Sequence, residues 1–483
     1  NFRMNKTYNQ QRSIPRIDTQ SQLRTIRRSP WRSLLSIALL VPVFGLRAQQ
    51  TPAASSSAMQ APQIHDFSVK EAIDYSSKNN VAVKNSLLDY QIQEQSNRAT
   101  TSAALPQVTG NLGLTDYIQI PTTLLPGEFL SPPQPGTYFP IKFGTKWNAT
   151  GGVTLKQTLF DGQVFVGLQA RSASLEYYHQ REEITQQMIR SNIYKIYYQL
   201  LIARSQIEQI DANITNQQAL LHNSTEMFKN GFAEQLDVDK ATVQLANLQS
   251  EKIQTEFNVS NGYLALKVLM GMPVRDSLHL TDTLTYDMLR DAALGDNYNY
   301  SDRHEFKLLE VGKQLNEFDV KRYKKMYIPT VSLTAAYSQN QYVNEFDLAA
   351  KNSWFPTTYL GLNVSIPIFD GFNKDANIRQ AKLRLQQTSN NMDSLKIRID
   401  NDVKEAQLRF SAALATLDYQ KKNMELSERV YQQTRKKYEQ GLGSNLEITN
   451  ALTDQKTAQA TFFNALYNAV IARVDYLTAI GKL

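Results

Sequence analysis

The 483-residue chain contains no cysteine, which excludes disulfide-stabilised folds, iron–sulfur clusters, thiolate zinc sites and a cysteine nucleophile. It has only five histidines, and they are scattered, which argues against a histidine-rich metal site. Beyond the first 48 residues there is no run of 18 apolar residues, so this part of the sequence offers no transmembrane helix. If it enters a membrane, it must do so as a β-barrel.

Excess positive charge is confined to the N-terminal segment. The chain has a formal charge of +7, but residues 1–48 carry nine basic residues and one acid, which leaves the other 435 residues at −1. Basic nucleic-acid binding therefore loses its main support. A mainly apolar stretch of thirteen residues, 34–46, follows the basic residues and predicts a secretory signal peptide, 1–48, cleaved after Ala48. An uncleaved anchor and a buried N-terminal helix are the alternatives, and without cysteine a lipid anchor is not available.

The sequence repeats itself at an offset of about 210 residues, which indicates one structural unit used twice. The matched positions are 105–108 with 328–331, Phe160-Asp161-Gly162 with Phe369-Asp370-Gly371, Asn230-Gly231 with Gln440-Gly441, Leu236-Asp237 with Leu446-Glu447, and 269–271 with 479–481. We therefore expect two structural repeats, 67–271 and 301–483. A linker at 49–66 would precede the first repeat, and a linker at 272–300 would join the two at the waist of the molecule.

Each half has the same predicted order of elements: a helical segment (68–104 and 303–326), two strands, and two very long helices joined at a glycine. Proline is absent from residues 141 to 271 and after residue 369, as long helices require, because proline breaks helix interiors. Apolar residues recur in alternating steps of four and three from Ile189 to Leu221 and from Val403 to Tyr438. This period of 3.5 residues predicts coiled-coil packing, and one face of an ordinary helical bundle is the alternative.

Gly231 and Gly441 interrupt the long helices and predict the tips of two helical hairpins, since glycine readily ends a helix with positive φ. The next helices should begin near Gln235 and Asn445. Asp237 and Glu447 would then lie in the first turns, where the helix dipole favours acidic side chains. A kink in one continuous helix is the alternative reading of each glycine.

Four segments alternate apolar with small polar residues: 108–115, 153–159, 331–337 and 360–366. Alternation is typical of a membrane β-barrel, although a half-buried soluble sheet has the same pattern. Four strands cannot close a transmembrane barrel, so a spanning chain must oligomerise, and three copies would supply twelve strands. The Phe-Asp-Gly corners end the second strand of each pair, and Asp161 and Asp370 are expected to cap the long helices that follow.

Taken together, the duplicated layout, the two Phe-Asp-Gly corners, the Leu/Ile-Pro pairs before the strands and the patterns after Gly231 and Gly441 resemble the TolC family of outer-membrane efflux factors. The resemblance covers residues 67–481. It implies an α+β fold of mainly long helices, assembled as a homotrimer with a shared twelve-stranded outer-membrane barrel on a periplasmic coiled-coil tunnel. It also implies a Gram-negative host and two partners: a periplasmic adaptor and an inner-membrane pump of the RND or ABC type.

The resemblance also assigns roles to residues at the tips. Tyr438 and Glu447 occupy the family's entrance-gating positions, but Gly443 and Asn450 stand where members have an arginine and an acid, so the family's salt-bridge latch is not expected. Asp237 and Glu447, repeated in three copies, would form a ring that favours cations, with solvated surface carboxylates as the alternative. The expected adaptor-docking residues are Gly231, Leu236, Asp237, Gly441, Leu446 and Glu447.

The sequence contains no phosphate-binding loop, dinucleotide fingerprint, zinc-protease motif or nucleophile elbow, so we predict no enzyme, cofactor or metal site. The predicted function is a passive exit duct for drugs, metals or proteins, energised by the pump. The Pro-rich loop at 120–146 is expected to be extracellular. The alternatives are a non-channel coiled-coil stalk or adhesin and an exported binding protein or hydrolase.

Overall fold

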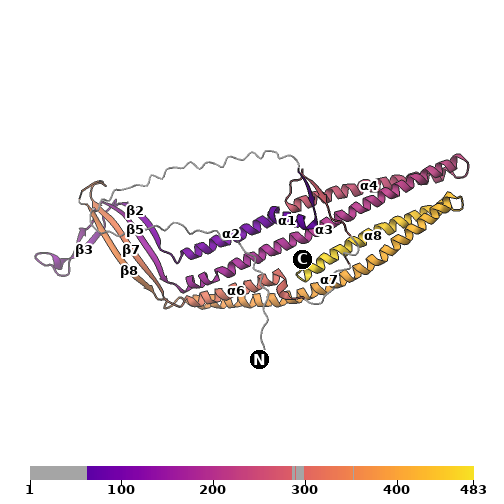
Figure 1. The fold of residues 1–483 in the computed structure, drawn as a ribbon. Coiled ribbons are helices and arrows are strands. Elements are labelled where there is room, and N and C mark those ends of the chain that lie inside the picture. Colours follow the sequence, from indigo (N-terminus) through magenta and orange to yellow (C-terminus); the bar gives the residue numbers. More distant parts are fainter. Residues whose placement is uncertain (1–62, 285–288, 290–297, 352) are drawn as a thin grey trace, which may run out of the picture. The chain divides into compact units, whose positions relative to one another are not determined.

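The computed structural model describes residues 63–284, 289, 298–351 and 353–483. The predicted signal peptide and most of the predicted linker at 49–66 lie outside these residues, as do most positions between 285 and 297. In the described part, a four-stranded sheet lies at one end of a set of long helices, and two helical hairpin turns lie at the other end (Figure 1).

The same order of elements occurs in the two halves. The first half contains α1 (Val69–Asn79), α2 (Val81–Ser102), β2 (Gln107–Asp116), β5 (Trp147–Phe160), α3 (Gly162–Lys229) and α4 (Gln235–Met270). The second half contains α6 (His304–Lys325), β7 (Thr330–Val343), β8 (Trp354–Ser365), α7 (Asn373–Glu439) and α8 (Asn445–Ala479). The predicted starts of the helices after the two tip glycines, at Gln235 and Asn445, are confirmed.

The helix predicted over 68–104 is broken at Asn80, and this prediction was wrong in that respect. The Asn80 side-chain oxygen accepts hydrogen bonds from the N–H groups of Ala82 (2.7 Å) and Val83 (3.2 Å) and so caps α2. Its amide donates to the carbonyl of Leu269 at the end of α4 (2.6 Å). A capping residue with a distant partner therefore ends one helix and begins the next within a sequence of otherwise helical character.

The sheet has the strand order β2-β5-β7-β8, and every pair is antiparallel. The register places Val108, Leu155, Ala335 and Leu360 in one row across the sheet. Successive residues point to opposite faces, so the apolar and the small polar residues separate as the sequence predicts. β2 and β8 are the edges, and every residue of β2 and all but one of β8 are exposed. None of the described helices contains a stretch long and apolar enough to cross a membrane.

A short hairpin is inserted between β2 and β5. It consists of β3 (Thr122–Pro126), the 3-10 turn η1 (Gly127–Phe129) and β4 (Tyr138–Lys142). These elements fall in the loop that the sequence places at 120–146. In Figure 1 the hairpin projects from the end of the sheet that lies away from the helices.

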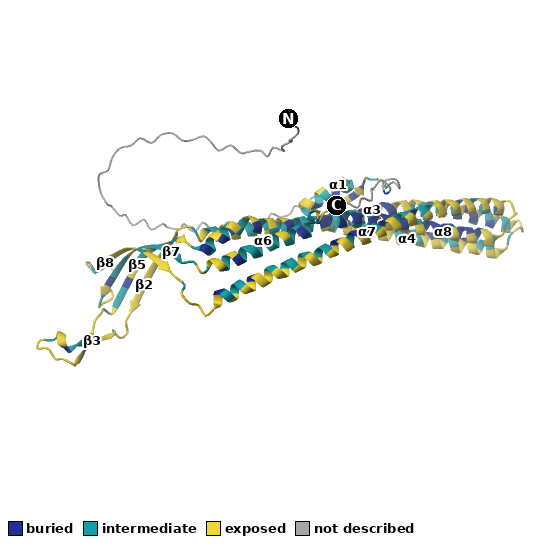
Figure 2. Cartoon of the chain, turned by 90° about the horizontal axis from the view of Figure 1, so that it is seen from below, coloured by how far each residue is buried: buried dark blue, intermediate teal, exposed yellow. Residues whose placement is uncertain are grey.

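Four helices pack side by side in the part away from the strands, in the order α4, α3, α8, α7. α3 is 68 residues long, or about 100 Å at 1.5 Å per residue. The seam predicted from Val403 to Tyr438 is confirmed, because Val403, Phe410, Leu417, Tyr431 and Tyr438 are buried. Buried residues gather along these helices, whereas the strands are largely half-buried or exposed (Figure 2).

The seam predicted for α3 is confirmed in part: Ile189, Ile193, Leu200, Ile210 and Gln217 are buried. The other predicted members, Ile196, Ala203, Ile207, Ile214 and Leu221, are half-buried, while Tyr197, Asn213 and Leu220 beside them are buried. The reason is that α3 has two neighbours in this region, α4 and α8, so its buried face is wider than the single stripe that a two-helix coiled coil would need.

A parallel pair of short strands lies at the middle of the helical part. β1 (Ile64–Phe67) pairs with β6 (Ser277–Leu280), and the hydroxyl of Tyr197 on α3 donates a hydrogen bond to the carbonyl of Phe67 (2.9 Å). Tyr197 is fully buried, and this burial raises the pKa of its phenol. The sequence treated both strand segments as linker, so this pairing was not predicted.

Gly271 provides a test of how the end of α4 packs against Asn79 and Asn80. It ends α4 with φ 72°, and a Cβ atom there would collide with the carbonyl of Asn79. Gly231 has a similar φ of 79° but open space around it. We expect Gly271→Ala to destabilise the fold clearly more than Gly231→Ala, for which the backbone strain alone should cost about 1 kcal/mol. Thermal unfolding followed by circular dichroism measures both, and equal shifts would contradict the packing around Asn80.

Candidate functional site at the hairpin tips

The two hairpin tips have the same backbone geometry. Gly231 and Gly441 adopt the left-handed conformation, with φ of 79° and 74°. In each turn the residue after the glycine donates its N–H to the carbonyl five positions earlier, Phe232 to Met227 (2.8 Å) and Leu442 to Lys437 (2.9 Å). This bond ends the helix cleanly and reverses the chain. The reading of each glycine as a hairpin tip, not a kink, is confirmed.

The helices that follow the tips begin with local caps. The Asp237 carboxylate accepts a hydrogen bond from the N–H of Glu234 (3.3 Å), and the Ser444 hydroxyl accepts one from the N–H of Glu447 (3.2 Å). Asp237 is half-buried and held by this contact, whereas Glu447 is exposed. The two acids that the sequence treats as equivalent therefore have different surroundings within one chain.

A groove of about 720 Å³ lies between the two tips. Five of the predicted site residues line it: Leu236, Asp237, Tyr438, Gly441 and Leu446. Gly231 and Glu447 are not among its lining residues. The structure thus brings most of the predicted tip residues from the two halves of the chain into one concave surface.

The most exposed apolar side chains at the tips were not predicted as site residues. Phe232 is 79% exposed and Leu442 is 78% exposed, and each directly follows its tip glycine. The two positions differ by 210, the offset of the sequence repeat, so extending the repeat by one residue would have found them. Exposed large apolar groups in matching places on two turns indicate a contact surface.

The contacts between the two hairpins in this part of the molecule include several polar ones. Ser224 of α3 and Tyr438 of α7 share a hydrogen bond between their hydroxyls (3.1 Å). Arg435 of α7 donates to the side chain of Asn216 (3.0 Å). These bonds link α3 directly to α7, and the Ser224–Tyr438 bond is buried. Tyr438 therefore contacts the opposite hairpin through a neutral hydrogen bond.

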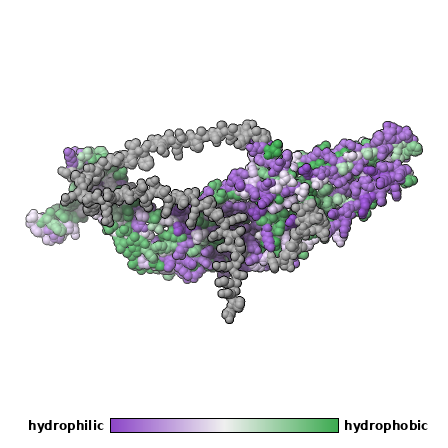
Figure 3. Space-filling model, viewed as in Figure 1, coloured by the Kyte–Doolittle hydropathy of each residue, from purple (hydrophilic) through white to green (hydrophobic). Residues whose placement is uncertain are grey.

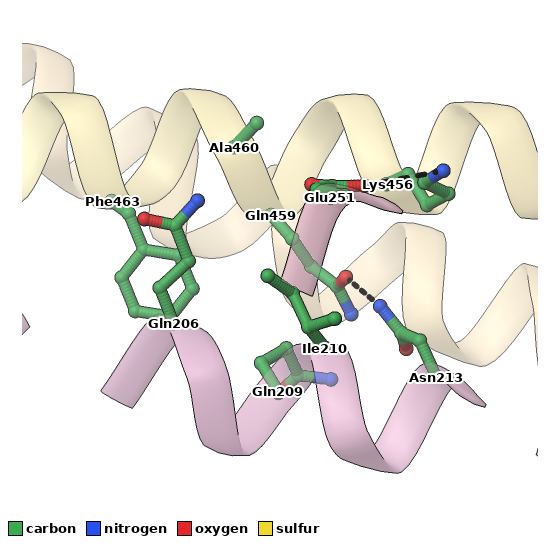
Figure 4. Close-up of a pocket in the computed structure, with 9 residues that line it drawn as sticks. All are labelled: Gln206, Gln209, Ile210, Asn213, Glu251, Lys456, Gln459, Ala460 and Phe463. Carbon is green, nitrogen blue, oxygen red and sulfur yellow. Dashed lines mark hydrogen bonds and ion pairs between the residues drawn. The ribbon is translucent and has the colours of Figure 1, made fainter. Parts of the chain in front are cut away.

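A third polar contact joins α3 to α8. Asn213 donates to the Gln459 side chain (2.8 Å) beside a small cavity that is also lined by Glu251 and Lys456, which form an ion pair (3.4 Å; Figure 4). Nearby, burial raises the pKa of Tyr431, so its phenol stays neutral at physiological pH. Hydrogen bonds between neutral amides and hydroxyls are individually weak in net terms, about 1 kcal/mol each.

The strand–helix corners differ from each other. Asp161 caps α3 as predicted, because its side chain accepts from the N–H of Gln163 (2.8 Å). Asp370 is not the capping residue of α7, and this is a correction: the cap position is Phe372, which has positive φ like Gly371 before it. Asp370 instead accepts from the N–H of Lys374 (3.0 Å) and pairs with its ammonium group (3.2 Å). The extra left-handed turn displaces the helix start by two residues.

Within the described ranges, no group of three or more histidine, aspartate or glutamate residues is placed to hold a metal ion. The tip groove is lined by apolar residues such as Phe232, Leu236 and Leu446 and by charged residues such as Glu234, Asp237 and Lys240.

Comparisons with known proteins identify what the chain is similar to. A family model described as "Outer membrane efflux protein" matches residues 72–272 and 313–482. The alkaline protease secretion protein AprF of Pseudomonas aeruginosa is 21% identical over 341 residues, which cover 68% of each chain. The outer membrane protein TolC of Vibrio cholerae is 18% identical over 337 residues, which cover 69% of this chain and 77% of TolC. Among solved structures, CusC has the same fold, with a TM-score of 0.71 and 18% identity, and the match covers 88% of this chain and 95% of CusC.

The tip geometry generates a testable expectation. Gly231→Val should strain the turn, because a β-branched residue resists positive φ, and should cost about 1–2 kcal/mol locally. Gly231→Asn is the matched control, since asparagine tolerates this conformation and should cost much less. Hydrogen exchange at the amide of Phe232, which the turn protects, measures the effect. Equal protection in both variants would contradict the assigned geometry.

Proposed function

Since the chain belongs to the outer membrane efflux protein family, we propose that three copies form a passive exit duct through the outer membrane of a Gram-negative bacterium. Twelve strands, four from each copy, close the β-barrel, and the long helices form a coiled-coil tunnel through the periplasm. The two structural repeats, 67–271 and 301–483, each supply one pair of strands and one helical hairpin. Solutes pass through the water-filled interior, and the energy comes from a partner.

The open edges of the sheet carry this proposal. β2 and β8 lie at the two ends of one antiparallel sheet, and their outer backbone groups have no partner strand among the residues that the structure describes. In lipid these groups must be paired, and a closed ring of sheets from several copies pairs them all. The apolar residues that gather over the sheet, in contrast to the hydrophilic far ends of the helices, support its place in the membrane (Figure 3).

Two unpartnered apolar stripes on the helices support the same assembly. α4 and α7 are the outermost of the four packed helices. On α4, five exposed apolar residues are separated by 10, 4, 7 and 4 positions, which keeps them on one side of the helix: Val243, Ile253, Phe257, Leu264 and Val268. On α7 the corresponding exposed residues are Ile397, Leu408, Tyr419, Leu426 and Val430. The α4 stripe has the period of a coiled-coil seam, whereas the α7 residues are separated by 11, 11, 7 and 4 positions and lie along one face of an ordinary helix. We place α4 of one copy against α7 of the next.

The relatives indicate the partners and the cargo. They are named for protease secretion, in AprF, and for efflux, in BepC of Brucella suis. We therefore assign this chain to a tripartite efflux or type I secretion system, with a periplasmic adaptor and an inner-membrane pump of the RND or ABC type. The adaptor binds the tip groove through Phe232, Leu236 and Leu446, which line it with exposed apolar side chains, and contacts the exposed Leu442 beside it. The alternative of a coiled-coil stalk or adhesin finds no counterpart among these relatives.

Gating in this duct rests on the hairpin-to-hairpin contacts at the tips. Tyr438 holds α7 to α3 through Ser224, and Gly443 stands where an arginine latch would be. In this proposal the closed mouth therefore depends on that neutral bond, on the Arg435–Asn216 bond and on the apolar packing around Leu220. Asp237 and Glu447 add a ring of negative charge around the mouth. Contacts of this strength can be broken by adaptor binding, which shifts the population toward the open state.

Assembly is tested by placing a charge in the α4 stripe. Phe257→Glu should weaken each α4–α7 seam by about 2 kcal/mol or more, because the carboxylate is buried without a partner. Gln249→Glu is the control, since it adds the same charge to an exposed position of α4 outside the stripe. Light scattering should give a trimer for the parent chain and the control but smaller species for Phe257→Glu. A parent chain that is monomeric and shows no conductance in planar bilayers would overturn the proposed function.

The gate is tested by removing one hydroxyl. Tyr438→Phe keeps the buried ring and loses the bond to Ser224, which should favour the open state by about 1 kcal/mol per copy. Ser224→Ala should have the same effect. The double variant should differ little from either single variant, because all three variants lose the same hydrogen bond. The open fraction in single-channel recordings measures this. An unchanged open fraction in both single variants would show that the closed mouth does not depend on this bond.

A further inference from the structure

The hairpin formed by β3, η1 and β4 presents an unusually apolar surface. Ile118, just before it, is 97% exposed, and Phe129 is 76% exposed. Further exposed apolar residues are Leu124, Tyr138 and Phe143. A two-stranded hairpin is marginally stable in water by itself, and exposed apolar groups make it less soluble without adding to its stability. This surface is therefore expected to be covered in the assembled protein.

The position of the hairpin in the sheet indicates what covers it. It leaves β2 after Asp116 and returns to β5 at Trp147, so it adjoins the edge strand β2. At the same end of the sheet, the connection from β7 to the other edge strand, β8, carries the exposed residues Phe346 and Leu348, and β8 itself begins with the partly exposed Trp354. At this end of the sheet, both edge strands, β2 and β8, therefore adjoin a segment with exposed apolar side chains.

Closing the barrel brings these two groups together. In the proposed trimer, β8 of one copy pairs with β2 of the next, at the usual strand spacing of about 4.8 Å. The β7–β8 connection of one copy then lies directly beside the β3–β4 hairpin of its neighbour. Charge also favours a protein contact over a charged lipid headgroup, because residues 118–142 contain only two charged side chains, Glu128 and Lys142, which have opposite signs.

We infer that the β3–β4 hairpin of each copy packs on the β7–β8 connection of the neighbouring copy and fixes the register of the β2–β8 pair between them. This inference rests on the proposed trimer. Within one chain, β7 and β8 are held in register by the turn that joins them, but no turn joins strands of different copies. β2 also contains Gly110 and Gly113, around which no side chain packs, and glycine-rich strands specify register weakly.

Cross-linking of the full chain tests the contact, and the absence of native cysteine makes the result unambiguous. Ile118→Cys combined with Leu348→Cys should give covalent dimers and trimers with a thiol cross-linker of roughly 10 Å, about twice the strand spacing. Ile118→Cys combined with Phe232→Cys is the control and should give none, because Phe232 lies at the opposite, helical end. A trimer that forms normally but gives no cross-links in the first variant would overturn the inference. Cross-links of Ile118→Cys alone would also overturn it, because the hairpins would then meet one another.

Stability provides a second test. Leu124→Ser, Phe129→Ser and Phe143→Ser combined should lower the temperature at which the trimer dissociates in detergent by roughly 5–10 °C. Phe232→Ser with Leu442→Ser, at the helical tips, should leave this temperature unchanged. If the dissociation temperature of the hairpin variant is unaltered, the hairpin is free for another partner and the inference is overturned. The same follows if Ile118→Cys in the intact trimer reacts fully with a membrane-impermeant thiol reagent. Failure of the parent chain to trimerise would instead overturn the proposed function.

Discussion

In the described part of the chain, the backbone groups along the outer edges of β2 and β8 have no partner strand, and the proposed assembly follows from this constraint. In lipid, an unpaired N–H or carbonyl costs several kcal/mol, and each edge strand exposes a row of them. A single copy cannot satisfy both edges, since its two outer strands lie on opposite sides of a four-stranded sheet. Closure through copies of the same chain removes every edge at once. In the proposed assembly, the exposed apolar stripes on α4 and α7 pack against those of neighbouring copies. Side-chain burial then joins the copies in the helical part, as hydrogen bonds between strands join them in the sheet.

The helical part combines two kinds of contact with different strengths. Within the α7–α8 hairpin, Phe410 stacks on Tyr476, and Leu417 packs near Ala465 and Ala469, so this pair buries a continuous apolar seam. Between the hairpins, near the tips, the contacts include the neutral hydrogen bonds of Asn213 and Ser224 and the bond from the Arg435 guanidinium to Asn216. They also include an apolar cluster of Leu220 with Tyr431 and Leu452. Apolar burial scales with area, whereas a neutral hydrogen bond exchanged with water contributes little net free energy. Because the contacts between the hairpins are of both kinds, the proposed opening of the tips has to break polar and apolar contacts together.

The departures from the sequence-based expectations have identifiable causes. The break at Asn80 depends on a bond to Leu269, far away in sequence, so no local pattern could indicate it. The parallel strands β1 and β6 are four residues each, and a strand of that length has too few residues to show alternation. At the second corner, the Phe-Asp-Gly motif is the same as at the first, but Phe372 takes a left-handed conformation and displaces the start of α7. Identical motifs thus give different caps when the following residues differ.

The sequence by itself determined the elements whose signals are local and repeated: the long proline-free helices, the tips at Gly231 and Gly441, the four alternating strands and the cap at Asp161. These follow from periodicity, backbone freedom and side-chain capping, which act over a few residues. Only the tertiary structure decided which neighbours those elements have: Ser224 opposite Tyr438, the tip groove with Phe232 and Leu446, the pairing of β1 with β6, and β2 and β8 as the two edges. The reason is that a contact between distant segments depends on how every intervening element packs, and a local sequence pattern does not contain this information.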